Sequence, residues 1–581
     1  MRTLFRWLVI VLALIGTVAT VAAIAGVMIL RSAEPEKTKV RKGDYLVVDF
    51  DRGIAAQPPR DALDSFSLGR SYVLADLITA LRRGAADPRI AGVAAHIGGA
   101  RPAPATAQEL AEAIADFKKV GKTTLLFSES LDGGPGAAAL ASAFRQVWLQ
   151  PSGLYGLRGL ALETPFLRSG LAEYGIRAEI VQRQEYKSAM DFLSRDDMAP
   201  AVRENIGALV SDIADSLNES IATARGLTPE AVRGLAARGP LLAAEAKAAG
   251  LVDALGYQAD FQAAVKAAFP GGALPAEAYA ATAETPNTDI RLALIQAAGQ
   301  IVPGETEFDP LADRAAIGAA TIAQAIRDAV KAKGVRAIVL RLETPGGDYA
   351  ASDTIRQAIA EARAANRPVI VSMGNVAASG GYFIASAAET VIAEPATITG
   401  SIGVIAGKIV LEDAWRKLGI RWNTLSTGET AAMWSPNHGF SPAERARLEA
   451  VVDAAYADFT AKVGEARKLA PEALDKAARG RVFSGKRALA LGLVDDTGGL
   501  LKAFAYAKRA AGIPADQIPA VVAFPRPKSL TETLRGLIGG DGRELMQAAL
   551  PRLPEPLATL SAWSRLKLER GAAIMPPISV R

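Results

Sequence analysis

The sequence predicts an α/β fold that is built twice in tandem. Four stretches of the first half resemble four stretches of the second half at offsets of 241 to 247 residues. In both halves, continuously apolar strand-like runs alternate with amphipathic helical patterns, which is typical of parallel strands covered by helices on both faces. A single long apolar run at the N-terminus adds a predicted transmembrane helix ahead of the two repeats.

The repeat is clearest where an amphipathic helix, a short turn and a buried strand follow one another. The four matching pairs are 45–54 with 292–301, 74–99 with 321–347, 174–181 with 418–425, and 238–256 with 479–498. Their offsets drift by a few residues, as insertions and deletions in surface loops would cause. Units of roughly 240 residues are too long for a solenoid repeat and fit two homologous domains.

These patterns divide the chain into four parts. We expect an anchor with a basic juxtamembrane segment at residues 1–42, the first repeat at 43–285, the second repeat at 286–530, and a C-terminal tail at 531–581. The boundary between the repeats is expected within residues 274–289, because this stretch is polar, loop-like and contains two prolines.

The N-terminal apolar run extends from Trp7 to Leu30 without a charged residue. At about 1.5 Å per residue, a helix of this length exceeds the hydrocarbon core of a bilayer, which is about 30 Å thick. Basic residues stand on both sides of the run, so the positive-inside rule does not set its orientation. A signal peptide cleaved near residues 23–25 is the alternative, but the run continues past that site and favours an uncleaved anchor. The remainder of the chain is expected to be soluble and to lie on one side of the membrane.

Composition excludes several kinds of site. The chain has no cysteine, which rules out disulfides, thiolate catalysis, zinc–thiolate sites and iron–sulfur clusters. Any Ser-His-Asp triad would need one of the two histidines, His96 and His438, and we interpret both as incidental. With 66 basic and 61 acidic residues, the net charge of +5 is too small for a dedicated nucleic-acid-binding protein. We expect no cofactor and no metal.

The two repeats differ at positions where catalysis would need a side chain. Ser379, in ASGGYFIASAA, aligns with Pro135 of the first repeat, and Lys187, in QEYKSAMDF, aligns with Ala431 of the second. The second repeat therefore has the serine without the lysine, and the first has the lysine without the serine. Such complementary loss is expected if two half-sites meet in one active centre. Drift between two purely structural copies is the alternative.

The chemistry of this pair is plausible. A serine hydroxyl is a weak nucleophile until a base removes its proton. A lysine becomes such a base when burial lowers its pKa by several units from about 10.4. Apolar neighbours of Lys187 would form the necessary pocket, whereas a solvated loop lysine is the alternative.

Glycines next to Ser379 and at residues 345–347 predict an oxyanion hole. Gly380 and Gly381 permit a tight turn into a helix, where Gly380 N–H would face a developing oxyanion. The Pro-Gly-Gly turn in RLETPGGDY follows a buried strand, and open α/β sheets bind ligands at such carboxyl ends. The N–H group of Gly346 or Gly347 would complete the hole. The alternatives are a helix-capping serine and an ordinary glycine-rich turn.

These motifs, together with TITGSIGV at residues 397–404, resemble the S49 serine peptidase family, and the duplicated length with its N-terminal anchor resembles the long form of that family. The resemblance covers residues 40 to 520 approximately. It implies two tandem crotonase/ClpP-like α/β domains. The implied roles are nucleophile for Ser379, general base for Lys187, lysine-orienting serine for Ser401, and oxyanion binding for Gly346, Gly347 and Gly380.

The same resemblance implies a single-pass protein of the bacterial inner membrane, assembled as a homotetramer with its catalytic domains in the periplasm. Its substrates would be signal peptides left after secretion. A second active centre is not expected, because the first repeat is degenerate around Pro135. We therefore expect a membrane-anchored serine endopeptidase with a Ser379–Lys187 dyad. A non-catalytic membrane scaffold and a crotonase-type acyl-CoA enzyme on the same fold stay open as alternatives.

Overall fold

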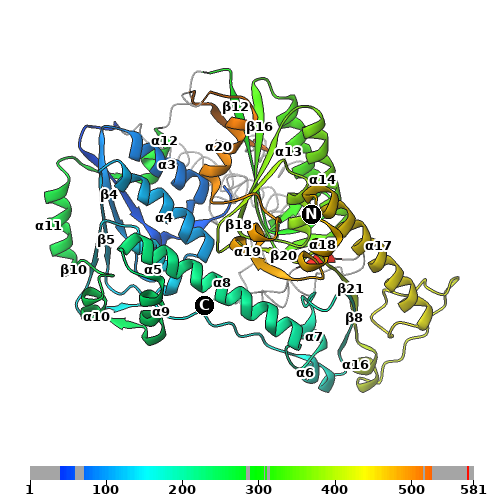
Figure 1. The fold of residues 1–581 in the computed structure, drawn as a ribbon. Helices are drawn as coiled ribbons and strands as arrows, with labels where there is room; N and C mark the ends of the chain where they lie inside the picture. Colours follow the sequence, from blue (N-terminus) through cyan, green and yellow to red (C-terminus); the bar gives the residue numbers. More distant parts are fainter. Residues whose placement is uncertain are drawn as a thin grey trace, which may run out of the picture.

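The computed structural model describes residues 39–58, 71–282, 288–306, 308–309, 314–514, 517–526 and 572–574. The predicted transmembrane run and most of the predicted tail lie outside these residues. Among the helices within them, none is both long enough and apolar enough to cross a bilayer. The described chain forms two α/β units that lie side by side, each around its own sheet (Figure 1).

The first repeat is organised around a six-stranded parallel sheet. In spatial order its strands are β10 (Ala254–Leu255), β6 (Gln146–Leu149), β5 (Thr123–Ser128), β4 (Ile90–His96), β1 (Asp44–Asp49) and β11 (Ala273–Pro275). Leu126 faces one hydrophobic core, whereas its neighbour Phe127 faces a second core on the opposite side of the sheet. Burial on both faces explains why these strands are continuously apolar in sequence.

The helices of the first repeat connect these strands and cover the sheet. They are α3 (Leu74–Ala86), α4 (Pro104–Lys119), α5 (Gly134–Ser142), α6 (Arg168–Glu173), α7 (Asp191–Ser194), α8 (Pro200–Arg225), α9 (Pro229–Arg238), α10 (Ala243–Ala248), α11 (Gln258–Ala268) and α12 (Ala276–Ala281). Short elements complete the repeat: the 3₁₀-helix η1 (Phe50–Arg52) and the strands β2 (Ile54–Ala55), β3 (Tyr72–Val73), β7 (Leu154–Tyr155) and β9 (Leu241–Leu242).

The second repeat has an equivalent sheet. Its main path runs β22 (Val482–Ser484), β20 (Ile398–Gly400), β18 (Val369–Ala378), β16 (Val335–Thr344), β12 (Arg291–Ala298) and β24 (Ala520–Phe524). The strand β19 (Thr390–Ala393) also pairs with β18 and carries β23 (Asp496–Thr497). Neighbouring strands are parallel except β22, which runs antiparallel to β20.

Helices cover both faces of this second sheet as well. They are α13 (Ala319–Lys331), α14 (Tyr349–Ala364), α15 (Gly380–Ser386), α16 (Glu412–Lys417), α17 (Pro442–Arg467), α18 (Pro471–Ala477), α19 (Gly485–Ala490) and α20 (Leu500–Ala510). Leu294 of β12 packs in the same core as Leu500 of α20, and its neighbour Ile295 faces the core that contains α13 and α14.

The structure shows the duplication directly. Helices α4 and α14 correspond end to end at an offset of 245 residues, and α6 and α16 correspond at an offset of 244. A capping box begins α17, since Ser441 N–H donates to the Glu444 carboxylate and Glu444 N–H donates to the Ser441 hydroxyl. Part of the predicted loop at 274–289 is wrong: residues 276–281 form α12, because Tyr279 is buried and anchors that helix.

A third sheet joins the two repeats. Its order is β14 (Phe308–Asp309), β15 (Arg314–Gly318), β13 (Gln300–Val302), β17 (Gly346–Asp348), β25 (Ala572–Ile574), β21 (Val404–Val410) and β8 (Arg177–Arg183). Only β8 comes from the first repeat. It pairs antiparallel with β21 over the whole length of both strands, so the loop after β8 is held against the second repeat (Figure 1).

A buried ion pair also fixes α4 of the first repeat on the sheet of the second. The Arg341 guanidinium, on β16, donates to both carboxylate oxygens of Glu109 at 3.2 and 2.6 Å, and both side chains are almost completely buried. Glu109 also accepts from Leu500 N–H. Such a pair adds little net stability over an apolar contact, but removing one partner leaves an uncompensated buried charge.

We therefore predict that Glu109→Ala lowers the free energy of unfolding by about 3–5 kcal/mol, because Arg341 would stay buried without its counter-ion. The matched control is Glu361→Ala, which removes a carboxylate paired with Arg327 at the surface and should destabilise the protein far less, because solvent screens an exposed pair. Urea unfolding of both variants measures the difference. Equal destabilisation by the two substitutions would contradict the assigned role of the buried pair.

Candidate active site

Ser379 lies at the turn where β18 ends and α15 begins. Its backbone has φ +57° and ψ −117°, an unfavourable conformation for a residue with a side chain, which costs on the order of 1–3 kcal/mol. The turn is held because Ser379 N–H donates to Gly400 C=O at 2.8 Å and Ser379 C=O accepts from Phe383 N–H. The strand–turn–helix geometry thus fixes the Ser379 hydroxyl at the N-terminus of a helix.

The glycines after Ser379 are required by close packing. A Cβ atom on Gly380 would lie 2.5 Å from the Ser352 hydroxyl, and one on Gly381 would lie 2.5 Å from the Thr344 methyl carbon. These distances are shorter than van der Waals contact, so larger side chains would push α15 away from α14 and β16. The small residues around Ser379 therefore set its position relative to the glycine turn.

Lys187 reaches this turn from the first repeat. It follows β8, and its Nζ lies 2.6 Å from Ser379 Oγ, although 192 residues separate the two in sequence. Ser401, at the end of β20, accepts from the same Nζ with both its hydroxyl and its carbonyl oxygen at 3.0 Å. All three side chains are fully buried. The structure therefore brings together Ser379, Lys187 and Ser401.

Burial lowers the pKa of Lys187 well below its ordinary value. Among the described residues its Nζ has no carboxylate as a hydrogen-bond partner, so no negative charge compensates for the lost hydration of an ammonium group. The neutral amine is thereby favoured, and its lone pair can accept the proton of the Ser379 hydroxyl. This is the protonation state that a general base requires.

Two glycines of the second repeat leave room for Lys187. A Cβ on Gly480 would lie 2.5–2.7 Å from the Lys187 backbone and Cβ, and one on Gly403 would lie 3.1 Å from Lys187 Cδ. Gly480 has φ +84° and donates its N–H to Ile402 C=O at 2.8 Å. The loop at 479–481 therefore packs directly against the residue that follows β8.

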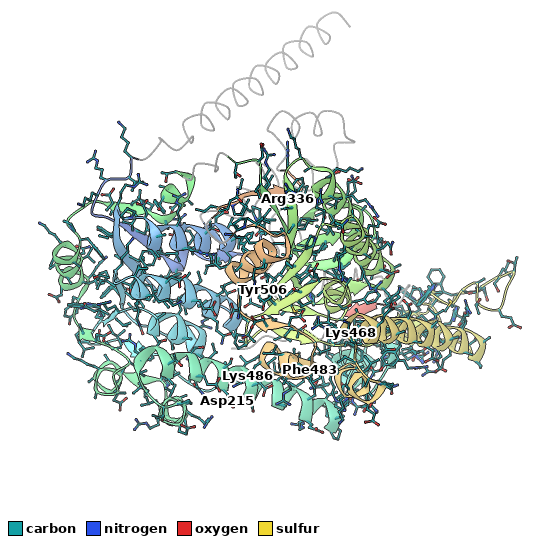
Figure 2. All side chains as sticks on the ribbon, turned by 45° about the horizontal axis from the view of Figure 1, so that its top comes forward. Asp215, Arg336, Lys468, Phe483, Lys486 and Tyr506 are labelled. Carbon is teal, nitrogen blue, oxygen red and sulfur yellow. The ribbon has the colours of Figure 1, made fainter. Side chains whose placement is uncertain are left out.

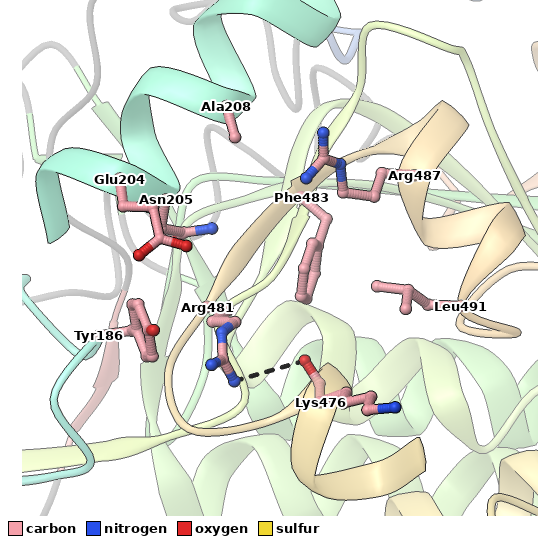
Figure 3. A pocket seen from close by; sticks show the side chains of 9 residues that line it. All are labelled: Tyr186, Glu204, Asn205, Ala208, Lys476, Arg481, Phe483, Arg487 and Leu491. Atoms are coloured by element: carbon pink, nitrogen blue, oxygen red, sulfur yellow. Dashed lines mark hydrogen bonds between the residues drawn. The ribbon is translucent and has the colours of Figure 1, made fainter. Parts of the chain in front are cut away.

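Charged and aromatic contacts pin the same loop to the first repeat. Arg479 forms a bidentate ion pair with Glu185, and Arg481 stacks on the Tyr186 ring at 4.0 Å from its centre. Figure 3 shows Tyr186 and Arg481 at one wall of a surface pocket of about 270 Å³. Neither Ser379 nor Lys187 lines this pocket. Its lining residues Tyr186 and Arg481 therefore affect the candidate site only by holding the loop at 479–481 in place.

The oxyanion candidates separate into two kinds. Gly346 N–H already donates to the Thr344 hydroxyl at 3.1 Å, so it is engaged and does not point freely into the site. Gly380 is the first residue of α15, where backbone N–H groups have no partner within the helix. The Gly347 nitrogen lies 3.3 Å from where a Gly380 Cβ would be. Gly347 and Gly380 therefore lie closest to the required arrangement.

A short strand of the chain's own C-terminal region lies beside these glycines. Strand β25 pairs antiparallel with β17, where Gly347 is opposite Ala573, and also with β21, where Ile405 is opposite Ala572. The space between β17 and β21 thus accommodates an extended polypeptide with strand pairing on both sides. The predicted tail at 531–581 contributes this strand to the described structure.

The first repeat has no equivalent dyad. Its helix α5 begins after Gly133, and Pro135 lies in the first turn, so no hydroxyl stands where Ser379 does. His438 is hydrogen-bonded to the Gly439 carbonyl and lies 4.0 Å from the Glu444 carboxylate. His96, the last residue of β4, is hydrogen-bonded to Glu129, which follows β5, and to Asp49 at the end of β1.

Within the described part of the chain, one group could hold a metal ion: Asp49, Asp51 and His96, whose ligand atoms lie within 4.8 Å of one another. Their side chains are already engaged with one another and with nearby backbone N–H groups, including those of Gly98 and Ala100. The group belongs to the first repeat and contributes no residue to the Ser379 turn.

The sequence-based reasoning missed the loop at 479–481. Its signal was present in the repeat itself, because Arg-Gly occurs both at 238–239 and at 479–480. Gly239 is as tightly packed as Gly480, with a Cβ position only 1.6 Å from Leu157 C=O. A glycine retained in both copies of a duplicated domain therefore marks a close backbone approach rather than a variable loop.

Comparison with known proteins finds a matching family and several relatives of this chain. The profile of Peptidase family S49 matches residues 128–269 and 361–514, one stretch in each repeat. Protease 4 from Salmonella typhi is 30% identical over 523 residues, covering 87% of this chain and 82% of that protein. Serine protease SPPA, chloroplastic, from Arabidopsis thaliana is 31% identical over 515 residues, covering 86% and 74%. Protease 4 from Haemophilus influenzae is 28% identical, covering 78% and 75%.

We predict that Gly480→Ala lowers kcat/KM by about 10²-fold, because a displacement of Lys187 by about 1 Å is enough for such a loss. The matched control is Gly492→Ala. Gly492 also has a positive φ, +72°, but the nearest atom to its Cβ position is a Leu469 methyl at 3.5 Å. Both variants pay a similar backbone cost, and only Gly480→Ala should lose activity in a steady-state assay. Equal activity in the two variants would rule out this role for Gly480.

The lowered pKa of Lys187 predicts a characteristic pH dependence of stability. Between its folded pKa and the unfolded value near 10.4, the unfolded chain binds the extra proton, so the free energy of unfolding rises with pH. Lys187→Met removes this contribution. Urea unfolding from pH 7 to pH 9 should therefore show the wild type gaining stability relative to Lys187→Met by up to about 1.4 kcal/mol per pH unit. A pH-independent difference would contradict the lowered pKa.

Proposed function

Because the chain belongs to peptidase family S49, we propose that it is a membrane-anchored serine endopeptidase with a Ser379–Lys187 dyad. The observation that carries the proposal is the 2.6 Å contact between Lys187 Nζ and Ser379 Oγ, to which each repeat supplies one group. Membership of the family makes the chain a serine peptidase. Ser379 and Lys187 are the residues that we propose perform the peptide hydrolysis.

In the proposed mechanism, Ser379 Oγ attacks the carbonyl carbon of the scissile peptide bond while Lys187 Nζ takes its proton. The N–H groups of Gly380 and Gly347 would donate to the oxyanion that forms. Lys187 then returns the proton to the departing amine, which leaves an ester between Ser379 and the acyl half of the substrate. Water, activated by the neutral Lys187, hydrolyses the ester and restores the hydroxyl. Ser401 keeps the amine aimed at Ser379 throughout.

The peptide substrate is proposed to bind as an extended strand between β17 and β21. The position of β25 supports this path, because its three residues pair with β17 and one of them, Ala572, also pairs with β21. Pairing through the backbone explains how peptides of different sequence could bind with the scissile bond near Ser379. A substrate would take the place that β25 occupies in this structure.

We further propose that the substrates are cleaved signal peptides and that the enzyme is a homotetramer of the bacterial inner membrane with its catalytic domains in the periplasm. The apolar run from Trp7 to Leu30 supports anchoring at the membrane, where signal peptides remain after cleavage. The residues of this run lie outside the described structure, so the proposal rests on their sequence and on the family resemblance.

The dyad predicts the effect of removing either group. In full-length protein purified in detergent, Ser379→Ala should lower kcat/KM for an apolar peptide by at least about 10⁴-fold, and Lys187→Ala by about 10²–10⁴-fold or more. The matched control is Lys408→Met, since Lys408 of β21 is also a buried lysine but is not bonded to Ser379. That variant should keep most of its activity.

Two outcomes would contradict the dyad. One is wild-type hydrolysis by Lys187→Ala. The other is a wild-type protein that neither hydrolyses peptides nor reacts with a serine-directed fluorophosphonate probe, which would indicate a scaffold. Labelling of the wild type but not of Ser379→Ala by the probe distinguishes the nucleophile from other serines.

A further inference from the structure

The pocket shown in Figure 3 lies where the two repeats meet. Its volume is about 270 Å³. The first repeat lines it with α8 and the residue before Lys187, and the second repeat lines it with the segment from α18 to the end of α19. Figure 2 shows two residues of this region, Phe483 and Lys486, at the boundary between the repeats. The mechanism proposed above uses none of the lining residues.

Two lining residues are directly connected to the base of the candidate dyad. Tyr186 immediately precedes Lys187 in the chain, and Arg481 stacks on the Tyr186 ring. The Arg481 carbonyl accepts a hydrogen bond from Ser401 N–H at 2.6 Å, and Ser401 in turn accepts from Lys187 Nζ. This wall of the pocket therefore supports both Lys187 and the serine that orients it.

A third lining residue supports the nucleophile. Phe483 of β22 lies opposite Thr399 of β20, and a Cβ on the adjacent Gly400 would lie only 2.8 Å from the Phe483 ring. Gly400 C=O accepts from Ser379 N–H, so the Phe483 ring packs behind the turn that carries the nucleophile. A ligand in this pocket would therefore contact the supports of both members of the dyad. It would not enter the path between β17 and β21, because neither strand lines the pocket.

The wall from the second repeat carries two cations without a counter-ion. Among the described residues, neither Lys476 nor Arg481 forms an ion pair, and the Arg481 guanidinium donates only to backbone carbonyls, at 3.4 and 3.5 Å (Figure 3). Arg487 differs, because two hydrogen bonds of 2.7 Å join it to the Asp212 carboxylate. A guanidinium and an ammonium that lie together without a counter-ion favour the binding of a carboxylate.

The opposite wall offers a negative charge. Glu204, on α8, forms no ion pair within the described part of the chain, and Figure 3 shows its side chain across the pocket from Lys476. Apolar side chains complete the lining, namely Ala208, Phe483 and Leu491. The pocket thus suits a small ligand that has a carboxylate at one end, an ammonium at the other and an apolar body between them.

We propose that this pocket binds a short peptide of apolar residues, with its carboxylate at Lys476 and Arg481 and its ammonium at Glu204. The volume favours a small ligand, since sites for drug-sized molecules usually measure about 300–1,000 Å³. Hydrolysis of an apolar peptide releases fragments of this kind. The assignment of the ligand as a reaction product therefore rests on the proposed function, whereas the site itself rests on the pocket.

The bound peptide is expected to stabilise the assembled dyad. A ligand shifts a conformational equilibrium towards the state that it binds better. In this structure the pocket is formed while Lys187 contacts Ser379, and a carboxylate held by Arg481 and Lys476 would fix the loop at 479–481 in that arrangement. The pocket is therefore a regulatory peptide site that lies behind the catalytic residues.

Calorimetric titration tests the site without requiring activity. We would titrate dileucine into full-length Ser379→Ala in detergent and expect saturable binding. Adding Lys476→Met should weaken the affinity by about 5–10-fold, because one charged hydrogen-bond donor is lost. The matched control is Lys486→Met, which removes a lysine of α19 that is paired with Glu219 and does not line the pocket. No binding, or equal affinity of the two lysine variants, would overturn the proposal.

Analogues of dileucine test the class of ligand. Dileucine amide lacks the carboxylate and N-acetyl-dileucine lacks the ammonium, so both should bind more weakly than dileucine. Octanoate carries a carboxylate and an apolar chain but no ammonium. If octanoate bound as tightly as dileucine and its affinity survived Glu204→Gln, the pocket would be a fatty-acid site and the peptide assignment would be wrong.

Hydrogen exchange tests the connection to the dyad. In the same inactive protein, saturating dileucine should slow the exchange of Ser401 and Gly480 N–H, which donate to backbone carbonyls across this wall. The N–H groups of β4, which does not line the pocket, should exchange at an unchanged rate. Binding without slower exchange at Ser401 and Gly480 would overturn the regulatory role. Binding to a protein whose wild type hydrolyses no peptide would contradict only the proposed function.

Discussion

The site depends on one constraint: a lysine amine must be buried without a counter-ion and still reach a serine on another domain. Burying an ammonium group is expensive, so the environment of Lys187 favours the neutral amine. The fold tolerates this unfavourable burial because the surrounding contacts hold the Lys187 side chain in place. Gly403 and Gly480 pack against its side chain and backbone, and Ser401 takes two hydrogen bonds from its Nζ.

The joining of the two repeats follows from this constraint. A base that belongs to one repeat and a nucleophile that belongs to the other can meet only if the repeats are fixed to each other. The antiparallel pairing of β8 with β21 provides the alignment, and the buried pair of Arg341 and Glu109 provides a second, polar contact between the repeats. Gene duplication thus supplies two copies of a half-site, of which each repeat retains a different part.

The sequence predicted the α/β class, the duplication and the residues of the candidate dyad for a specific reason. Each repeat serves as a reference for the other, so the loss of the serine at Pro135 and of the lysine at Ala431 is visible without any other sequence. Continuous apolar runs likewise indicated buried parallel strands, because burial on both faces leaves no polar alternation.

Other features could not be predicted because they depend on geometry rather than pattern. The engagement of Gly346 N–H by the Thr344 hydroxyl depends on the conformation of one turn. The ion pair of Arg479 with Glu185 joins residues 294 positions apart on irregular loops, which have no periodic signal. Residues 276–281 looked like a polar linker, yet a single buried tyrosine makes them a helix.

The most direct test of the account is an NMR titration of protein labelled with ¹³C at the lysine ε carbon, with Lys187→Met to assign the resonance. We predict that the pKa of Lys187 lies well below the ordinary lysine value and that the amine is neutral at the pH of catalysis. A Lys187 resonance that titrates near 10.4, as in an exposed lysine, would contradict it.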